Sequence, residues 1–264
     1  MLSYRHGFHA GNPADVLKHA ALIALVQAMQ VKDKGFCYVD THAGAALYDL
    51  KSAFALKNRE HEKGIGRLWF DPPPGAALNR YRDLIRQFNP DGALRWYPGS
   101  PALVREWLRP QDRMLLCELH GTEAEILRER YQRDAQVAVH QRNGYEALKA
   151  LLPPKEKRGL ILIDPPYELK NEVADMKQAL TQALQRFASG VYAIWYPYLQ
   201  GRDALQDIKE HGPIKRLETH NLRFDFPESI TMGRMSGCGL FIINPPWHAR
   251  EALVELGQIQ RVFE

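Results

Sequence analysis

The hydrophobic positions of the chain form two alternating patterns. Short runs rich in apolar and β-branched residues predict strands, and longer stretches with apolar residues three and four positions apart predict helices. The predicted strands span residues 36–40, 113–119, 135–141, 159–166 and 190–197, and the predicted helices between the later strands span 122–134, 144–152 and 175–187. This alternation predicts an α/β fold in which helices cover a parallel sheet.

The two ends of the chain depart from this alternation. Residues 214–226 and 237–244 are strand-like and are joined by a loop without helix spacing, so they predict an antiparallel hairpin at the end of the sheet. Residues 13–29 have helix spacing, and Asn12 and Pro13 suit the N-cap and the first turn of that helix. The helix leads directly into the first strand.

The interval between the first two strands is unusually long. The first predicted strand ends near residue 40 and the second near residue 118, whereas a whole βαβ unit needs only about 30 residues. A helix is predicted over 76–89 inside this interval. We therefore predict one domain over residues 1–264, with an inserted, mainly helical subdomain over 49–97.

The composition is that of an ordinary globular protein, with 45% hydrophobic and 25% charged residues and a formal net charge of +4. The positive excess suits a polyanion-binding surface without requiring one. No apolar run is long enough to cross a bilayer, so we expect a soluble, cytoplasmic protein without a membrane partner. Cys37, Cys117 and Cys238 lie in apolar runs and are expected to be buried, not paired or metal-bound.

Polar residues follow the ends of successive predicted strands, which meet at one edge of a parallel sheet. A small-residue turn containing Gly44 follows the first strand, and Glu118, Asn143 and Asp164 follow the next three. The carboxylate of Glu118 suits the two hydroxyls of a ribose, and the amide oxygen of Asn143 suits an adenine amine. Polar residues also end strands for purely structural reasons, so the order of the set is more informative than any member.

The fourth of these strands ends in Asp164-Pro165-Pro166-Tyr167. An exocyclic adenine amine is a poor nucleophile because its lone pair is delocalised into the ring. The carboxylate of Asp164 and the carbonyl of Pro165 could hold the two amine hydrogens, while the ring of Tyr167 stacks on the base. Asp164 could either take the departing proton or only orient the amine. The alternative interpretation is a rigid proline turn without chemistry.

A second motif of the same kind, Asn244-Pro245-Pro246-Trp247, ends the last predicted strand. Because that strand is antiparallel, its end should emerge at the opposite edge of the sheet, on the order of 20 Å from Asp164. We therefore predict a structural turn in which Trp247 is packed as an anchor. Asn244→Ala should spare the chemistry that Asp164→Ala abolishes.

The N-terminal segment interleaves aromatic and basic residues and contains His6 and His9. Metal binding is disfavoured because no cysteine or carboxylate cluster accompanies the histidines. The segment is either a loop that stacks on a base and contacts phosphate or a strap packed on the domain. The helix that follows it could bring Lys18 and His19 to the site.

These motifs together resemble the RlmJ family, whose members methylate N6 of one adenine in 23S ribosomal RNA with S-adenosylmethionine. The matching segments are 2–19, 40–45, 97–101, 118–120, 162–168 and 244–247. The resemblance implies a Rossmann-like class I methyltransferase fold, with a mostly parallel seven-stranded sheet, a terminal antiparallel strand and a small helical insertion. It also implies S-adenosylhomocysteine as product and no metal.

The resemblance implies roles for individual residues. Cofactor contacts are expected at Lys18, His19, His42, Ser100, Glu118, Asn143, Gly144 and Asp164. Substrate contacts are expected at Tyr4, His6, Lys18 and Tyr167, and the catalytic residues are Asp164, Pro165 and Tyr167. Many relatives have aspartate where this chain has Asn143, so we expect a somewhat weaker hold on the cofactor.

The partner implied is 23S ribosomal RNA, either protein-free or in an early assembly intermediate, and the enzyme is expected to act as a monomer. Two other interpretations remain open. One is methylation of a different exocyclic amine, such as guanine N2 or adenine in DNA, because several families share Asp-Pro-Pro-aromatic. The other is a non-catalytic RNA-binding protein that has kept the fold.

Overall fold

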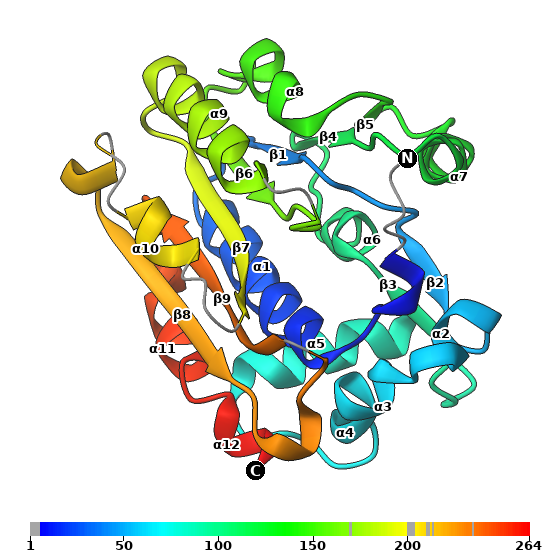
Figure 1. The fold of residues 1–264 in the computed structure, drawn as a ribbon. Helices are drawn as coiled ribbons and strands as arrows, with labels where there is room; N and C mark the ends of the chain where they lie inside the picture. Colours follow the sequence, from blue (N-terminus) through cyan, green and yellow to red (C-terminus); the bar gives the residue numbers. More distant parts are fainter. Residues whose placement is uncertain (1–5, 169–170, 200–203, 210–211, 213, 234) are drawn as a thin grey trace.

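A seven-stranded sheet forms the centre of the molecule in the computed structural model (Figure 1). The structure describes residues 6–168, 171–199, 204–209, 212, 214–233 and 235–264. The strand order is β5-β4-β1-β6-β7-β9-β8. The strands are β1 (Cys37–Asp40), β4 (Arg113–Cys117), β5 (Val137–His140), β6 (Gly159–Ile163), β7 (Val191–Leu199), β8 (Thr219–Asp225) and β9 (Met235–Ile243).

The pairing of the strands confirms the predicted sheet. Strand β1 pairs in parallel with β4 and β6, and β5 and β7 extend this parallel core on either side. Strand β9 is antiparallel to both β7 and β8, so β8 and β9 form the predicted hairpin. The antiparallel strand comes last in the chain but lies second from the edge of the sheet.

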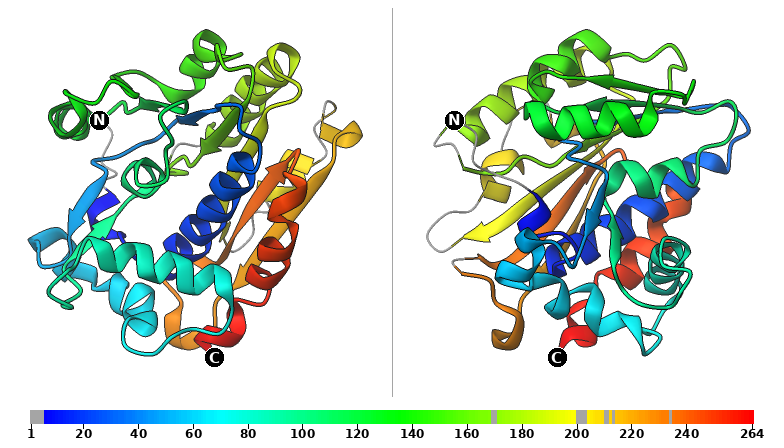
Figure 2. Two further views of the ribbon diagram at one scale, coloured as in Figure 1. Left: turned by 180° about the vertical axis from the view of Figure 1, so that it is seen from behind. Right: turned by 90° about the vertical axis from the view of Figure 1, so that its right-hand side faces the viewer.

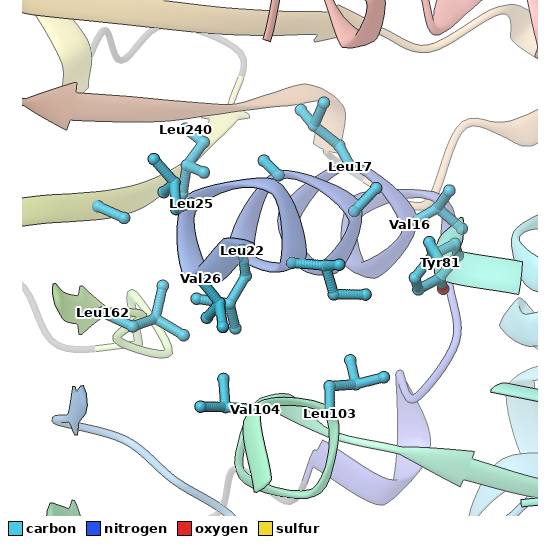
Figure 3. Close-up of a cluster of buried hydrophobic side chains, with 14 of the residues drawn as sticks. Val16, Leu17, Leu22, Leu25, Val26, Tyr81, Leu103, Val104, Leu162 and Leu240 are labelled. Atoms are coloured by element: carbon cyan, nitrogen blue, oxygen red, sulfur yellow. The ribbon is translucent and has the colours of Figure 1, made fainter. Parts of the chain in front are cut away.

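Helix α1 (Pro13–Gln30) lies at the centre of one face of the sheet and is buried on nearly all sides. The predicted N-cap is confirmed, because Asn12 Oδ1 accepts a hydrogen bond of 2.9 Å from the backbone N–H of Asp15. Figure 3 shows apolar side chains of α1 between Leu162 of β6, Leu240 of β9 and Leu103 of helix α6 (Ser100–Arg105). A helix that is apolar all round has to be enclosed in this way.

The remaining helices form layers on the two faces of the sheet. Leu160 and Leu162 of β6 belong to the hydrophobic cluster around α1, whereas Ile161 and Ile163 belong to a second cluster, because alternate residues of a strand face opposite sides. Helices α6, α7 (Gly121–Tyr131) and α11 (Arg250–Leu256) contribute to the first cluster. Helices α8 (Gly144–Leu151), α9 (Glu172–Arg186) and α10 (Ala204–Lys209) contribute to the second.

The long interval between β1 and β4 is mainly helical. It contains α2 (Ala53–Asn58), α3 (Glu60–Lys63), α4 (Ile65–Trp69) and α5 (Ala76–Gln87). The short strands β2 (Leu47–Asp49) and β3 (Trp96–Pro98) flank these helices in the chain and pair antiparallel with each other. Buried residues of the interval, such as Ile65 and Tyr81, belong to the same cluster as α1, so the inserted helices share the core of the domain. Figure 2 shows α1 between the sheet and helices α5 and α11.

Several elements lack a clear pattern in the sequence. Strands β2 and β3 and helices α6, α10 and α11, together with the short C-terminal helix α12 (Gln260–Phe263), were not predicted, because each is too short for its periodicity to stand out. The burial of Cys37, Cys117 and Cys238 is confirmed. No helix within the described ranges is both long and apolar enough to cross a membrane.

The turn that begins at Asn244 lies at the opposite end of the strands from Asp164, beside the start of β7. Ile243 pairs with Tyr192 at the start of β7, whereas Ile163, which precedes Asp164, pairs with Ile194 further along the same strand. Asn244 Nδ2 donates hydrogen bonds of 2.8 Å to the carbonyl oxygens of Ala188 and Gly190, just before β7. The predicted direction of this strand end is therefore confirmed.

The predicted packing of Trp247 is wrong. The residue is 69% exposed, and the guanidinium of Arg250 lies over its ring at 4.1 Å. Trp247 begins a short 3₁₀ helix (Trp247–Ala249) that continues into α11, and the buried positions of this segment are Ala249, Leu253 and Leu256. Trp247 lies on the solvent side of that turn. The hydrogen bonds of Asn244, and not the packing of Trp247, hold the chain where it leaves β9.

Asn244 has a φ of 54°, in the left-handed region that asparagine tolerates and alanine does not. Both Asn244→Gly and Asn244→Ala remove the two side-chain hydrogen bonds, but only alanine adds backbone strain. We expect Asn244→Ala to lower the free energy of unfolding by about 1 kcal/mol more than Asn244→Gly. Guanidinium unfolding of the two variants measures this difference, and equal stability would contradict the strain.

Candidate active site

The ends of the parallel strands bring the expected cofactor residues together around one cavity, which we call the inner pocket. It lies between the start of α1, the turn after β1 and the ends of β4, β5 and β6. Its lining includes all the residues for which cofactor contacts are expected, namely Lys18, His19, His42, Ser100, Glu118, Asn143, Gly144 and Asp164. Gly144 is required here, because a Cβ at this position would lie 2.1 Å from the carbonyl oxygen of Thr41.

A second hollow, which we call the outer groove, adjoins the inner pocket. Its walls come from α1, from α2 and α3, from β7 and from the turn between β8 and β9. Pro165 and Tyr167 line the outer groove, and His6, Lys18, Asp164 and Pro166 line both hollows. The two hollows therefore meet at Asp164. Tyr4, for which a substrate contact is expected, lies outside the described residues.

The carboxylate of Glu118 is held by backbone N–H groups on two sides. Gly44 N donates to Oε2 at 2.8 Å and His120 N donates to Oε1 at 2.7 Å. Gly44 has a φ of 60°, which glycine adopts without strain. Each carboxylate oxygen keeps a second lone pair, so Glu118 can still accept two hydrogen bonds from a ligand in the inner pocket.

Behind the pocket, the last residue of β1 is a fully buried acid. Asp40 Oδ2 accepts hydrogen bonds from Ser100 Oγ at 2.6 Å and from Tyr38 OH at 2.7 Å. Burial raises the pKa of Asp40 to about 6, because these hydrogen bonds only partly offset the loss of solvation. Ser100 therefore links the pocket surface to a carboxylate in the core.

Two histidines of the inner pocket are uncharged at neutral pH. Burial lowers the pKa of His19 to about 3 and that of His42 to about 4. His19 Nδ1 is hydrogen-bonded to Tyr97 OH at 2.7 Å, and His42 Nδ1 to Thr41 Oγ1 at 2.7 Å. These contacts orient the rings without adding charge to the pocket.

The ammonium of Lys18 is buried between two carboxylates. Lys18 Nζ lies 2.7 Å from Asp15 Oδ1 and 2.6 Å from Asp164 Oδ2. Burial disfavours the ammonium, but the charges of Asp15 and Asp164 outweigh that effect and raise the pKa of Lys18. Asp15 is itself buried, yet the charges of His6 and Lys18 hold its pKa well below its usual range. A buried charge needs such partners to be tolerated.

Asp164 presents one carboxylate oxygen to the junction of the two hollows. Oδ2 is paired with Lys18, and no described residue donates a hydrogen bond to Oδ1. The turn that follows is pinned by Tyr167, whose hydroxyl donates to the carbonyl oxygen of Trp195 at 2.7 Å. Tyr167 has a φ of 55°, an unfavourable backbone conformation that occurs at functional sites when the surroundings hold it in place.

The oxygen of Asn143 has a second role. Asn143 Oδ1 accepts hydrogen bonds from the backbone N–H groups of Tyr145, at 2.8 Å, and Glu146, at 3.4 Å, and so caps α8. The expected contact with an adenine amine requires this same oxygen. This oxygen is already held by the cap, through a short hydrogen bond to Tyr145 N and a longer one to Glu146 N, which makes it a poorer acceptor for an amine.

Some residues of the site were not predicted. Asp15 was missed, although an acid and a base three residues apart on a mostly apolar helix indicate a buried ion pair. Glu172 was also missed, and it lies at the first position of α9 with no local pattern to mark it. It lines the inner pocket and is 4% exposed.

The described part of the N-terminal segment is packed against the inserted helices. Phe8 contacts Phe54 of α2 with ring centroids 5.0 Å apart, and His9 pairs with Glu60 of α3 at 2.9 Å. His6 Nε2 lies 2.9 Å from Asp15 Oδ2. Over these residues the segment is a strap, and it also places His6 at the junction of the two hollows. Within the described ranges no group of three or more His, Cys, Asp or Glu side chains could hold a metal ion.

Known proteins resemble this chain over nearly its whole length. A family model described as "Ribosomal RNA large subunit methyltransferase D, RlmJ" matches residues 33–261. Ribosomal RNA large subunit methyltransferase J of Escherichia coli (strain K12) is 42% identical over 256 residues, which cover 96% of this chain and 90% of that protein. The protein of the same name from Haemophilus influenzae is 43% identical over 259 residues, with 97% and 92% covered. A crystal structure of a protein from Legionella pneumophila matches with a TM-score of 0.86 at 38% identity, and covers 97% of this chain and 94% of that one.

The low pKa of His19 makes stability depend on pH. Below pH 6.5 the unfolded chain protonates this histidine, whereas the folded protein keeps it neutral down to about pH 3, so stability is lost as the pH falls. We expect the stability advantage of wild type over His19→Asn to shrink by about 2 kcal/mol between pH 7 and pH 5. Urea unfolding at the two pH values measures it. Asp40 and His42 also make stability depend on pH, Asp40 in the opposite direction and His42 in the same direction, but both are present in wild type and variant, so their effects cancel in the difference. A stability difference that is the same at pH 7 and pH 5 would contradict the low pKa of His19.

Removal of the Lys18 charge leaves the buried Asp15 with His6 as its remaining charged partner, and it takes from the partly buried Asp164 the cation that now pairs with it. We expect Lys18→Met to lower the free energy of unfolding by about 3–5 kcal/mol, because an uncompensated buried charge is strongly unfavourable. The double variant Lys18→Met/Asp15→Asn should recover part of this loss, with a coupling of about 1–3 kcal/mol in the double-mutant cycle. Strictly additive effects in guanidinium unfolding would show that the two side chains act independently.

Proposed function

Because the chain belongs to the RlmJ family of ribosomal RNA large subunit methyltransferases, we propose that it transfers a methyl group from S-adenosylmethionine to the N6 amine of an adenine in 23S ribosomal RNA. The observation that carries this proposal is the junction of the inner pocket with the outer groove. Among the described lining residues, Asp164 is the one carboxylate shared by both hollows. A cofactor in the first and a base in the second would meet beside it.

The residues of the inner pocket fit this cofactor. S-adenosylmethionine, when bound, supplies a methyl group on a positively charged sulfonium. The carboxylate of Glu118 would accept the two ribose hydroxyls, since both of its oxygens are oriented by backbone N–H groups. A positively charged sulfonium is also favoured because His19 and His42 are neutral and Lys18 is paired with two carboxylates. The product, S-adenosylhomocysteine, has a neutral sulfur, so it would be held less strongly by the pocket and be released.

Asp164 and Pro165 would activate the amine by holding its hydrogens. Asp164 Oδ1 would accept one N–H and the carbonyl oxygen of Pro165 the other, which directs the nitrogen lone pair towards the inner pocket. The amine becomes acidic as its bond to the methyl carbon forms, and Asp164 would take the proton that it loses. Lys18 keeps Oδ2 occupied, so that Oδ1 is the oxygen offered to the substrate. Positioning and electrostatics would thus supply the catalysis.

The outer groove suits a flipped base and the RNA strand around it. Tyr167 and Trp195 supply aromatic surface next to Asp164, with ring centroids 5.8 Å apart. Lys57 and Lys63 are exposed along the same groove, where they could neutralise phosphates. An adenine reaches the junction only when it is unstacked, which favours protein-free RNA or an early assembly intermediate as substrate. Residues of one chain would supply the whole site, so the enzyme would act as a monomer. It would act in the cytoplasm, where its ribosomal RNA substrate is assembled into ribosomes.

Asp164→Ala tests the proposed chemistry, and Asn244→Gly is the matched control from the similar motif at the opposite edge of the sheet. Both would be incubated with protein-free 23S RNA and labelled cofactor, and the nucleosides identified by mass spectrometry. We expect N6-methyladenosine from wild type and Asn244→Gly, and a rate about 10²- to 10⁴-fold lower from Asp164→Ala. Glycine is used at position 244 because it tolerates the left-handed φ.

The possible outcomes separate the alternatives. If wild type produced N2-methylguanosine, the substrate base would be guanine and not adenine. If wild type methylated duplex DNA but not RNA, the substrate would be DNA. A wild-type protein that binds S-adenosylhomocysteine yet yields no methylated nucleoside would sink the catalytic assignment. Equal loss of activity in the two variants would show that Asp164 acts through stability alone.

A further inference from the structure

One residue in the lining of the inner pocket, Glu172, carries a buried carboxylate oxygen to which no described residue donates a hydrogen bond. Glu172, the first residue of α9, is 4% exposed and lines the pocket together with Asn143, Tyr145 and Pro166. Its Oε1 accepts a hydrogen bond of 2.9 Å from the hydroxyl of Tyr145. Its Oε2 is buried and receives no hydrogen bond from any residue in the described part of the chain.

An unpaired buried carboxylate oxygen is unfavourable, because the group has lost its water without gaining a donor. Such an atom on a residue that lines a binding pocket points to a ligand that brings a donor to it. A carboxylate oxygen only accepts hydrogen bonds, so the ligand group must carry N–H or O–H. The hydroxyl of Tyr145 holds the other oxygen and thereby fixes which oxygen is available.

The neighbours of Glu172 place this residue at the end of the pocket where the nucleobase is expected. Tyr145, which donates to Glu172, is the second residue of α8 and follows Asn143 in the turn after β5. Strand β5 pairs with β4, and the residue that follows β4 is Glu118, which is proposed to bind the ribose. In a sheet of this kind the ligand lies across the carboxyl ends of the strands, so a base attached to a ribose at Glu118 would extend towards the end of β5. The oxygen of Asn143 is engaged in capping α8 and is therefore a poorer acceptor for the amino group of an adenine. An acceptor is needed at this point, and Glu172 has one unused.

We propose that Glu172 Oε2 accepts a hydrogen bond from the amino group of the adenine of S-adenosylmethionine, and that this contact selects adenine over other bases in the cofactor. The inference rests on the proposed function, because it takes the inner pocket to be the cofactor site. It assigns base recognition to the helix that follows the Asp164 motif and leaves Asn143 as a structural cap.

The test compares ligands that differ only at the proposed contact. Binding of S-adenosylhomocysteine and of its analogue with hydrogen in place of the adenine amino group would be measured by isothermal titration calorimetry. We expect wild type to bind the first about ten- to a hundredfold more tightly, as for a hydrogen bond to a charged group. Glu172→Met removes the acceptor but keeps the length and burial of the side chain, so it should abolish this preference.

Two further measurements make the assignment specific. The same comparison is made with 5′-methylthioadenosine and its analogue that has hydrogen in place of the amino group, both of which lack the amino-acid part. It should give the same loss of preference in Glu172→Met. The double variant Glu172→Met/Asn143→Asp should regain the preference, because an aspartate at position 143 can cap α8 with one oxygen and accept from the base with the other. Failure to regain it would contradict the placement of the amino group between these two residues.

The outcomes that overturn the proposal differ from those that overturn the function. Equal weakening of both S-adenosylhomocysteine ligands by Glu172→Met would show that Glu172 does not contact the amino group. Weakening confined to ligands that carry the amino-acid part would assign the oxygen to the α-ammonium instead. A wild-type protein that binds none of the ligands would contradict the proposed function itself, whatever Glu172 does.

Discussion

The ammonium of Lys18, buried between the carboxylates of Asp15 and Asp164, is the interaction on which the site depends. It joins the central helix α1 to the end of β6, two elements far apart in the chain. Because α1 is enclosed by the sheet and by helices α5, α6 and α11, the hydrophobic core sets the position of Lys18 and thereby the orientation of Asp164. A buried charge cannot be left without a partner, so packing and electrostatics have to be satisfied together.

Charge balance continues through the rest of the inner pocket. Burial keeps His19 and His42 neutral, and the carboxylate of Glu118 is oriented by backbone N–H groups. The pocket is therefore suited to a positively charged ligand, while the exposed lysines lie along the outer groove. This separation gives each hollow a different chemistry, although the two share Asp164.

The two Asp/Asn-Pro-Pro-aromatic motifs show how the same local sequence acquires different roles. Asp164 follows a strand that runs with the parallel core, and Asn244 follows the one strand of the described sheet that runs against it. The first motif therefore faces the pocket and the second holds the turn at the opposite edge. A comparable division applies to Asn143 and Glu172, since the former caps a helix and the latter keeps a free acceptor in the pocket.

The sequence by itself determined the parallel sheet with its antiparallel hairpin, the capped helix α1 and the edge at which Glu118, Asn143 and Asp164 gather, because periodicity and strand direction are local properties of the chain. Only the tertiary structure decided how these side chains are paired. The partners of Lys18, the capping role of Asn143, the free oxygen of Glu172 and the exposure of Trp247 all depend on which distant segments meet. A hydrogen bond forms where packing brings a donor to an acceptor, and the local sequence pattern does not predict which distant residue that partner is.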